Sequence, residues 1–175
     1  MKYLLTVLLL IGFSISAQAR GTYLAPADFV NQSFGGDAPT AQLLFLGDEA
    51  KAQLKAILAH EPKAKRLRYW QEGRKSVWIL EEVGKTKSIT AGFVINDNKI
   101  EQVKVLIFRE SRGWEVRFPF FTNQFVGAGL RSDHKLTQTV DGISGATLST
   151  RAMTKMGRIA LYLHGQVMSN CDACE

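Results

Sequence analysis

The stretch Asp141-Gly142-Ile143-Ser144-Gly145-Ala146-Thr147-Leu148-Ser149-Thr150 decides the fold of this chain, because a long amphipathic run follows it. Its small residues predict a turn that opens a helix, with Gly142 and Gly145 allowing backbone angles that other residues avoid. The first N–H groups of a helix lack intrahelical acceptors, so such a start attracts anions, phosphate above all. By spacing alone the stretch also fits an ordinary capped helix. The hydroxyl residues gathered here are Ser144, Thr147, Ser149 and Thr150.

The run after this turn predicts a helix from about Leu148 to Val167. Its apolar residues recur at helical spacing, while basic residues lie outside that stripe. A helix with one apolar stripe buries it against another element, so we expect it to pack on a sheet. The stripe consists of Ala152, Met156, Ile159, Leu163 and Val167.

The middle of the chain has the alternation typical of strands. A polar turn at residues 96–99 joins the last two predicted strands into a hairpin with one buried face. The predicted fold class is therefore α+β: a twisted antiparallel sheet packed against helices, including the long C-terminal helix after the Ser-Gly-Ala-Thr turn. The predicted strands cover residues 66–70, 76–83, 89–95 and 100–108.

The first 19 residues have the pattern of a secretory signal peptide. Lys2 precedes an apolar run at residues 3–15, and Ala17-Gln18-Ala19 resembles a cleavage site. Cleavage after Ala19 would leave about 156 residues, enough for one domain with a core. No later run reaches the ~20 apolar residues of a membrane-spanning helix. We therefore expect a periplasmic protein that is not membrane-spanning once processed and has no lipid anchor, since no cysteine lies near the cleavage site.

Residues 20–64 are predicted to form a helical adaptor segment. One short helix is expected to start near Pro26, and a second to run from Asp48, as its N-cap, to His60. The domain that follows ends where the long helix ends, and a short tail remains. The predicted division is thus 1–19, 20–64, 65–168 and 169–175.

The two cysteines, Cys171 and Cys174, both lie in the tail. In an exported chain they predict a local disulfide, with a redox-active dithiol as the alternative. Two thiolates cannot complete a structural zinc site, and no metal site is predicted. His60 and His164 are interpreted as helix-end and helix-surface residues.

The formal net charge is +6 at pH 7, and the basic residues are scattered. No basic arm interleaved with aromatic residues is present, which argues against nucleic acid as a partner for an exported protein. An acidic redox partner or a phosphate-bearing cofactor fits better, and a solvated basic face is the simplest alternative.

The sequence Asp-Gly-Ile-Ser-Gly-Ala-Thr-Leu-Ser resembles the flavinylation motif of the FMN-binding domain family, which includes the NqrC and RnfG subunits of membrane redox complexes. In that family the threonine of Ser-Gly-Ala-Thr carries FMN through a phosphoester bond. The resemblance implies Thr147 as the acceptor, with Ser149 and Thr150 as lesser candidates. The surrounding recognition sequence would be Asp141, Ser144, Gly145, Ala146, Leu148 and Ser149.

Two further segments resemble the family in the same order. Residues 110–114 are similar to its Glu-Thr-Pro-Gly-Leu-Gly loop, with Arg112 in place of Pro and Trp114 in place of Leu. Residues 121–127 look like its Phe-x-x-Gln-Phe-x-Gly segment. Together the resemblance covers roughly residues 88–163 and implies that Glu110, Gly113 and Trp114 lie at the flavin. Trp114 also fits a surface-capping aromatic, and Arg112 and Arg109 are interpreted as possible charge compensation for phosphate or reduced flavin.

The resemblance implies covalent FMN as cofactor and an FAD:protein FMN transferase, dependent on Mg²⁺, as a partner. The expected role is electron transfer between redox partner proteins, which include a membrane-bound one. No catalytic residue is predicted, since the flavin would supply the redox chemistry. The alternatives are a noncovalent FMN-binding or sensing module, a flavin-dependent reductase of a small acceptor, and a structural exported domain whose motif is fortuitous.

Overall fold

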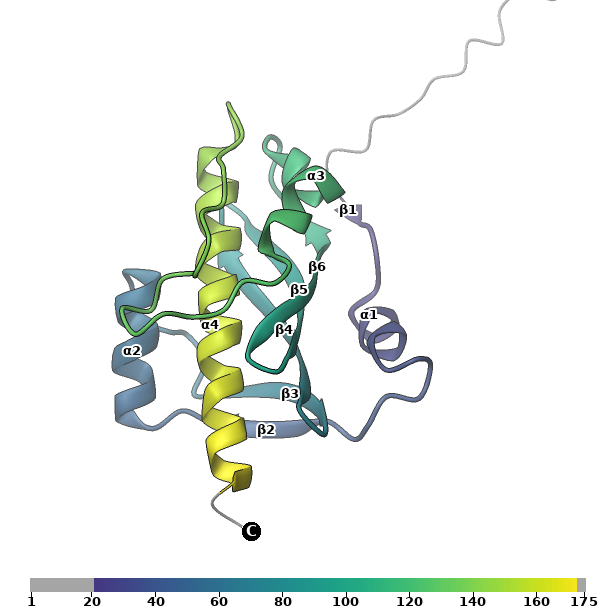
Figure 1. Ribbon diagram of the computed structural model, residues 1–175. Coiled ribbons are helices and arrows are strands. Elements are labelled where there is room, and N and C mark those ends of the chain that lie inside the picture. Colours follow the sequence, from purple (N-terminus) through teal and green to yellow (C-terminus); the bar gives the residue numbers. More distant parts are fainter. Residues whose placement is uncertain (1–20, 173–175) are drawn as a thin grey trace, which may run out of the picture.

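The computed structural model describes residues 21–172, with side chains described as far as residue 169. Six antiparallel strands form one open sheet in the order β1-β6-β5-β4-β3-β2. Figure 1 shows the sheet with helices on both faces. The strands are β1 Gly21–Thr22, β2 Gln42–Phe45, β3 Arg66–Glu72, β4 Lys75–Val83, β5 Ser88–Asn96 and β6 Lys99–Phe108. The helices are α1 Pro26–Ser33, α2 Asp48–Leu58, α3 Pro119–Thr122 and α4 Thr147–Asp172, with the 3-10 turns η1 Trp114–Arg117 and η2 Asn123–Phe125.

The predicted α+β class is confirmed. β3 to β6 correspond to the four predicted strands, each one or two residues longer at an end. The β5–β6 hairpin turns through Asp97 and Asn98, whose φ angles are 49° and 60°. Positive φ at both central residues marks the tight hairpin turn that Asn and Asp favour.

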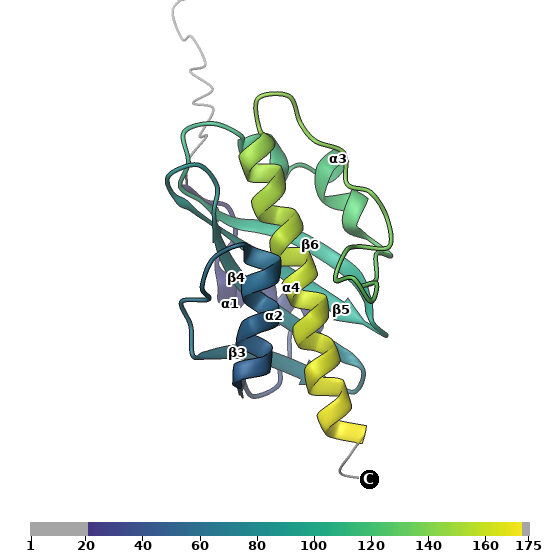
Figure 2. The ribbon, with the colours of Figure 1, turned by 90° about the vertical axis from the view of Figure 1, so that its left-hand side faces the viewer.

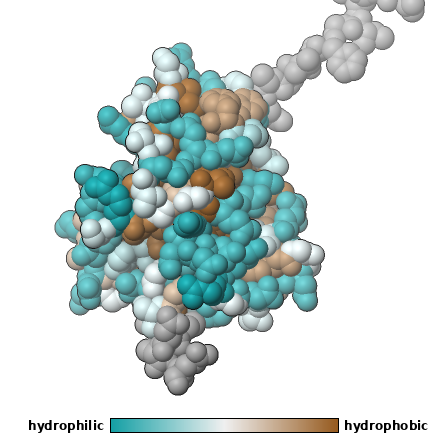
Figure 3. Space-filling view, viewed as in Figure 1, coloured by the Kyte–Doolittle hydropathy of each residue, from teal (hydrophilic) through white to brown (hydrophobic). Residues whose placement is uncertain are grey.

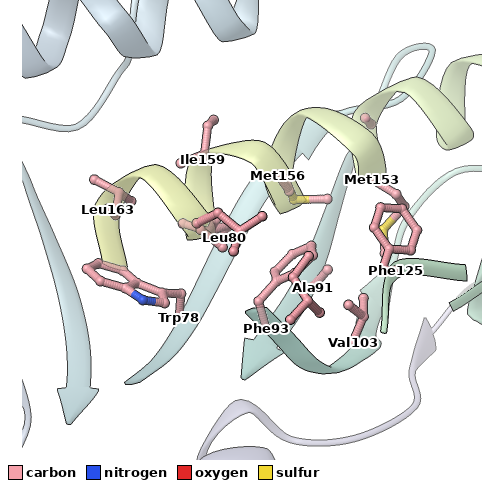
Figure 4. Packing of buried hydrophobic residues seen from close by; sticks show 14 of the residues in the cluster. Trp78, Leu80, Ala91, Phe93, Val103, Phe125, Met153, Met156, Ile159 and Leu163 are labelled. Carbon is pink, nitrogen blue, oxygen red and sulfur yellow. The ribbon is translucent and has the colours of Figure 1, made fainter. Parts of the chain in front are cut away.

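The main core lies between the sheet and α4, the 26-residue C-terminal helix. Figure 4 shows Met153 and Met156 of α4 facing Phe93 and Phe125, all four fully buried. The α4 stripe predicted from helical spacing is the face that packs here. Figure 2 shows α2 lying beside α4 on this side of the sheet.

The prediction that only one face of the hairpin is buried was wrong. Every residue of β5 from Ile89 to Ile95 is buried, because α1 covers the face opposite α4. The ring of Phe29, 1% exposed, packs so closely on β5 that a Cβ at Gly92 would lie 2.3 Å from it. Helices on both faces therefore turn an alternating pattern into a continuous buried one.

Residues 21–64 also complete the sheet, since they supply both edge strands, β1 and β2. Neither strand was predicted, because each is short and mostly exposed. The predicted boundary at residue 64 falls in the connection between α2 and β3 and stays a prediction. Helix α2 begins one residue after its N-cap Gly47, so the expected N-cap, Asp48, is its first residue. It ends before Ala59, which has φ 63°, so His60 lies beyond the helix.

The prediction that His164 lies on the helix surface was wrong, because this residue is only 1% exposed. Its Nδ1 lies 2.8 Å from the Ser76 hydroxyl, which accepts a hydrogen bond from Trp78 Nε1 at 2.8 Å. Burial, and then the nearby charge of Arg74, lower the pKa of His164 from 6.5 to about 4. His164 is therefore a neutral core residue at physiological pH.

Within residues 21–172, no helix combines the length and the hydropathy needed to cross a bilayer. The predicted signal peptide, residue 20 and Cys174 lie outside the described residues, as does the side chain of Cys171, so the disulfide stays a prediction.

Candidate functional site

The motif forms a tight turn that ends in the first residue of α4. The Ala146 N–H donates to the Ile143 carbonyl at 2.9 Å, and Gly145 has φ +80°, a conformation that favours glycine. The Ala146 carbonyl then accepts the N–H of Thr150 at 2.9 Å, which makes Ala146 the cap residue. The N–H groups of the next residues have no intrahelical acceptor, so the turn creates an anion-attracting helix start at Thr147.

The hydroxyl residues of this turn differ in exposure. The side chains of Ser144 and Thr147 are exposed. Ser149 and Thr150 are only 4% and 8% exposed, and they belong to the buried side of the first helical turn. Of the three acceptor candidates, only Thr147 is an exposed residue.

The loop at residues 110–113 packs directly against this helix start. Gly113 has φ +82°, and a Cβ built on it would lie 2.5 Å from Ser149 Oγ and 3.4 Å from Ala146 Cβ. Only glycine fits both the backbone angle and the space. The family-like loop at residues 110–114 is therefore in contact with the motif at residues 141–150.

The family-like segment at residues 121–127 is hydrogen-bonded to the motif. The side-chain oxygen of Gln124 accepts the N–H of Asp141 at 2.7 Å. Gln138, just before the motif, donates from Nε2 to the carbonyls of Gln124 and Val126. Gln124 thus holds the start of the turn in place, a role that sequence alone did not assign.

Glu110 is buried, 4% exposed, and its carboxylate binds the β4–β5 turn. Its Oε1 accepts the backbone N–H groups of Lys85, Thr86 and Lys87 at 2.5, 2.6 and 2.9 Å. Burial would raise the pKa of Glu110, but these N–H donors and the Thr86 hydroxyl outweigh it and lower the pKa. Glu110 is therefore an ionised anchor that holds this turn beside the helix start.

These pieces surround an open depression of about 360 Å³ at the start of α4. This volume lies within the range of roughly 300–1,000 Å³ typical of small-molecule sites. The predicted residues that line it are Glu110, Gly145, Ala146, Thr147, Leu148 and Ser149.

Four predicted site residues do not line the depression. Gly113 packs against Ser149, which lines the depression. Asp141 and Ser144 are exposed on the turn that precedes α4. The ring of Trp114 packs edge-on against Phe118, 5.4 Å between centroids, and under the guanidinium of Arg117. The fold thus gives Trp114 a packing role at η1, which the sequence had left open.

Sequence reasoning missed Lys85 and Ser111, and it interpreted Arg112 only as a possible charge partner. All three line the depression. Neither Lys85 nor Arg112 has a carboxylate within ion-pair distance among the described residues. These two cations outnumber the one carboxylate of the lining, Glu110, so the depression is cationic on balance. Lys85 reaches the site through the turn that Glu110 holds, which no local sequence signal indicates. Arg109, by contrast, is paired with Glu81 at 3.2 Å.

A family model described as "FMN-binding domain" matches residues 84–162. The match starts at the β4–β5 turn and ends within α4, so it contains every element that builds the depression. This part of the chain belongs to the FMN-binding domain family, and the chain is an FMN-binding flavoprotein. No curated protein matches the sequence.

The residues present fit flavin mononucleotide. Its phosphate requires cations and N–H donors, which Lys85, Arg112 and the start of α4 supply. The exposed side chain of Leu148 offers an apolar contact at the rim, at 41% exposure. When bound, the flavin would supply reversible electron-transfer chemistry, and these side chains would hold and orient it.

Proposed function

We propose that this chain is an exported flavoprotein that carries FMN covalently, through a phosphoester to Thr147, and transfers electrons between redox partners. The observation that carries the proposal is the exposure of Thr147 in a cationic depression, with Ser149 and Thr150 buried beside it. The signal-peptide pattern of residues 1–19 supports export to the periplasm.

Attachment would require a partner enzyme, an FAD:protein FMN transferase. The Thr147 oxygen would attack the flavin-side phosphorus of FAD, the pyrophosphate bond would break, and AMP would leave as the hydroxyl proton is lost. Lys85 and Arg112 would balance the phosphate charge during this transfer. Asp141, exposed on the turn, is available for recognition by the transferase.

A covalent bond makes occupancy independent of affinity, which favours it in an exported protein. A helix start stabilises an anion by only about 0.3–2 kcal/mol. A micromolar complex requires about 8 kcal/mol, and flavin lost outside the cytoplasm has no ready replacement. The phosphoester leaves the flavin ring free for redox chemistry.

Apolar surface near the site supports a partner-docking role. Both ribbon views place α3 and the first turns of α4 at the same end of the molecule. Phe118 and Phe120 are 36% and 61% exposed there, and Figure 3 shows hydrophobic side chains gathered at this end. A small apolar contact beside cationic side chains suits a transient complex with an acidic redox partner.

The test is production of the mature chain together with a competent FAD:protein FMN transferase. We expect a fluorescent band on a denaturing gel and one peptide that gains the mass of FMN less water. Thr147→Ala should remove both signals, Thr147→Ser should retain part of them, and Ser149→Ala and Ser144→Ala should leave them unchanged.

Unmodified wild-type peptide from such cells would overturn the covalent proposal. If native protein were nevertheless yellow, the noncovalent FMN-binding module would be the correct function. Steady turnover of a soluble donor and a small acceptor would favour the reductase over a carrier.

A further inference from the structure

The outer edge of β6 is open along half of its length. On this edge β1 pairs only with Ile107 and Phe108, and the Leu106 carbonyl accepts the N–H of Tyr23 at 2.8 Å. At the other end, Ile100 exchanges backbone hydrogen bonds of 2.8 Å with residues 127 and 128. Within the described residues, no strand pairs with residues 101–105 on this side.

A groove of about 740 Å³ runs along this open edge. All five residues 101–105 line it. Because neighbouring side chains of a strand point to opposite faces, a hollow that touches all five follows the strand edge, and it extends onto the α1 face at Ser33 and Val94. Tyr23 and Leu24 form one wall, and Phe118 and Val126 belong to the other. Figure 1 shows β1, α1 and α3 around this part of β6.

The groove contains a cation held in a fixed position. The guanidinium of Arg117 lies 4.4 Å from the ring centroid of Tyr23 and 4.9 Å from those of Trp114 and Phe118. Its Nε is buried and has no hydrogen-bond acceptor among the described residues. Three rings restrict the side chain, so little freedom is lost when it binds an anion.

The charge of the groove is positive. Neither Arg117 nor Lys104 has an ion pair within the described residues, whereas Glu101 is paired with Lys75 at 3.2 Å. A carboxylate would satisfy Arg117 through the paired hydrogen bonds that guanidinium groups favour. The apolar walls would accept the neighbouring side chains of an extended chain.

We propose that the open edge of β6 is a docking site for an extended segment of a partner protein that carries an acidic side chain. The segment would add a short strand beside residues 101–105, about 17 Å in length, and its carboxylate would bind Arg117. This interaction does not depend on flavin at Thr147, so it can be tested on the Thr147→Ala chain as well.

The test uses the mature chain labelled with ¹⁵N and an acetylated, amidated peptide, Thr-Val-Asp-Val-Thr. We expect saturable NMR shifts of the amides of residues 101–105 and of the Arg117 Nε–H. Arg117→Gln should weaken binding about tenfold, the loss expected for one hydrogen bond to a charged group. Lys104→Gln should weaken binding by a smaller factor, because Lys104 is an exposed cation of the same groove. Lys135→Gln, an exposed cation outside the groove, should leave the affinity unchanged.

Two controls separate strand addition from loose charge attraction. The same peptide methylated on alternate backbone nitrogens keeps its side chains but cannot pair with a strand, so we expect its binding to fall about tenfold or more. A peptide with Asn in place of Asp should bind about tenfold more weakly. Equal binding of the methylated peptide, or shifts outside the groove, would overturn the proposal.

A second copy of the chain is the competing occupant. Sedimentation of the peptide-free protein should show a monomer at concentrations where the peptide binds. The contrary result is a dimer whose formation shifts the same amides and that the peptide does not dissociate. This result would assign the edge to self-association and overturn the partner proposal.

Discussion

At the scale of single residues, the site depends on side chains whose size is set by a neighbour. Gly113 is the clearest case, since Ser149 Oγ occupies the position next to its missing Cβ. Gly127 has the same φ of +82° but no neighbouring atom within 4 Å. The pair separates the cost of the backbone angle from the cost of the contact.

Gly113→Ala should destabilise the protein more than Gly127→Ala. The left-handed angle costs about 1–2 kcal/mol at either position, and overpacking adds about 1–3 kcal/mol at Gly113. Urea denaturation measures both free energies of unfolding. Adding Ser149→Ala should restore part of the stability lost in Gly113→Ala, but none of that lost in Gly127→Ala. Equal losses in the two single variants would mean that the loop does not press on the helix start.

At the scale of elements, the β4–β5 turn is held from outside by a carboxylate at the end of β6. Three backbone N–H groups of the turn converge on Glu110, and Lys85 is carried to the depression by this arrangement. A charged acceptor in such a position is costly to remove, because three backbone donors lose their partner together.

Glu110→Gln should lower the free energy of unfolding by about 1–3 kcal/mol. Hydrogen exchange should accelerate at the amides of Lys85, Thr86 and Lys87, which lose their charged acceptor. Glu81→Gln is the matched control on the same hairpin, because its side chain is 54% exposed and its ion pair contributes about 0–1 kcal/mol. Unchanged exchange in the Glu110 variant would show that the turn is held without the carboxylate.

At the scale of the whole molecule, α4 connects the candidate site to the far end of the core. It begins at Thr147 and, almost five turns later, buries His164 against Ser76 of β4. Because His164 remains neutral in the folded core and is protonated in the unfolded chain, its burial couples stability to pH.

Stability should be complete above pH 6.5 and should fall as the pH is lowered toward about 4, the pKa of folded His164. In this window the unfolded chain binds a proton that the folded chain does not, so about 3 kcal/mol is lost. Denaturation at several pH values in this range measures how the free energy of unfolding depends on pH. His164→Gln should remove this pH dependence, while His134→Gln, at a half-buried position, should retain it. A slope unchanged in His164→Gln would assign the acid sensitivity to other groups.

The sequence allowed prediction of the four central strands, the hairpin turn, the α4 stripe and the motif. Each depends on neighbours within a few residues, such as the alternation at 100–108 or the spacing of Met156 and Ile159. It did not reveal β1 and β2, which are short edge strands with exposed side chains. The burial of His164 was also missed, because a single polar residue on an apolar helix gives no sign of what packs against it.

The sequence by itself determined the class of fold, the position of the helix start and the hydroxyls that surround it, because turn chemistry and periodicity are local properties. Only the tertiary structure decided which hydroxyl is exposed, what Glu110 binds and that Lys85 lies beside Thr147. These facts depend on contacts between segments far apart in the chain, and such contacts are set by how the sheet and α4 pack together.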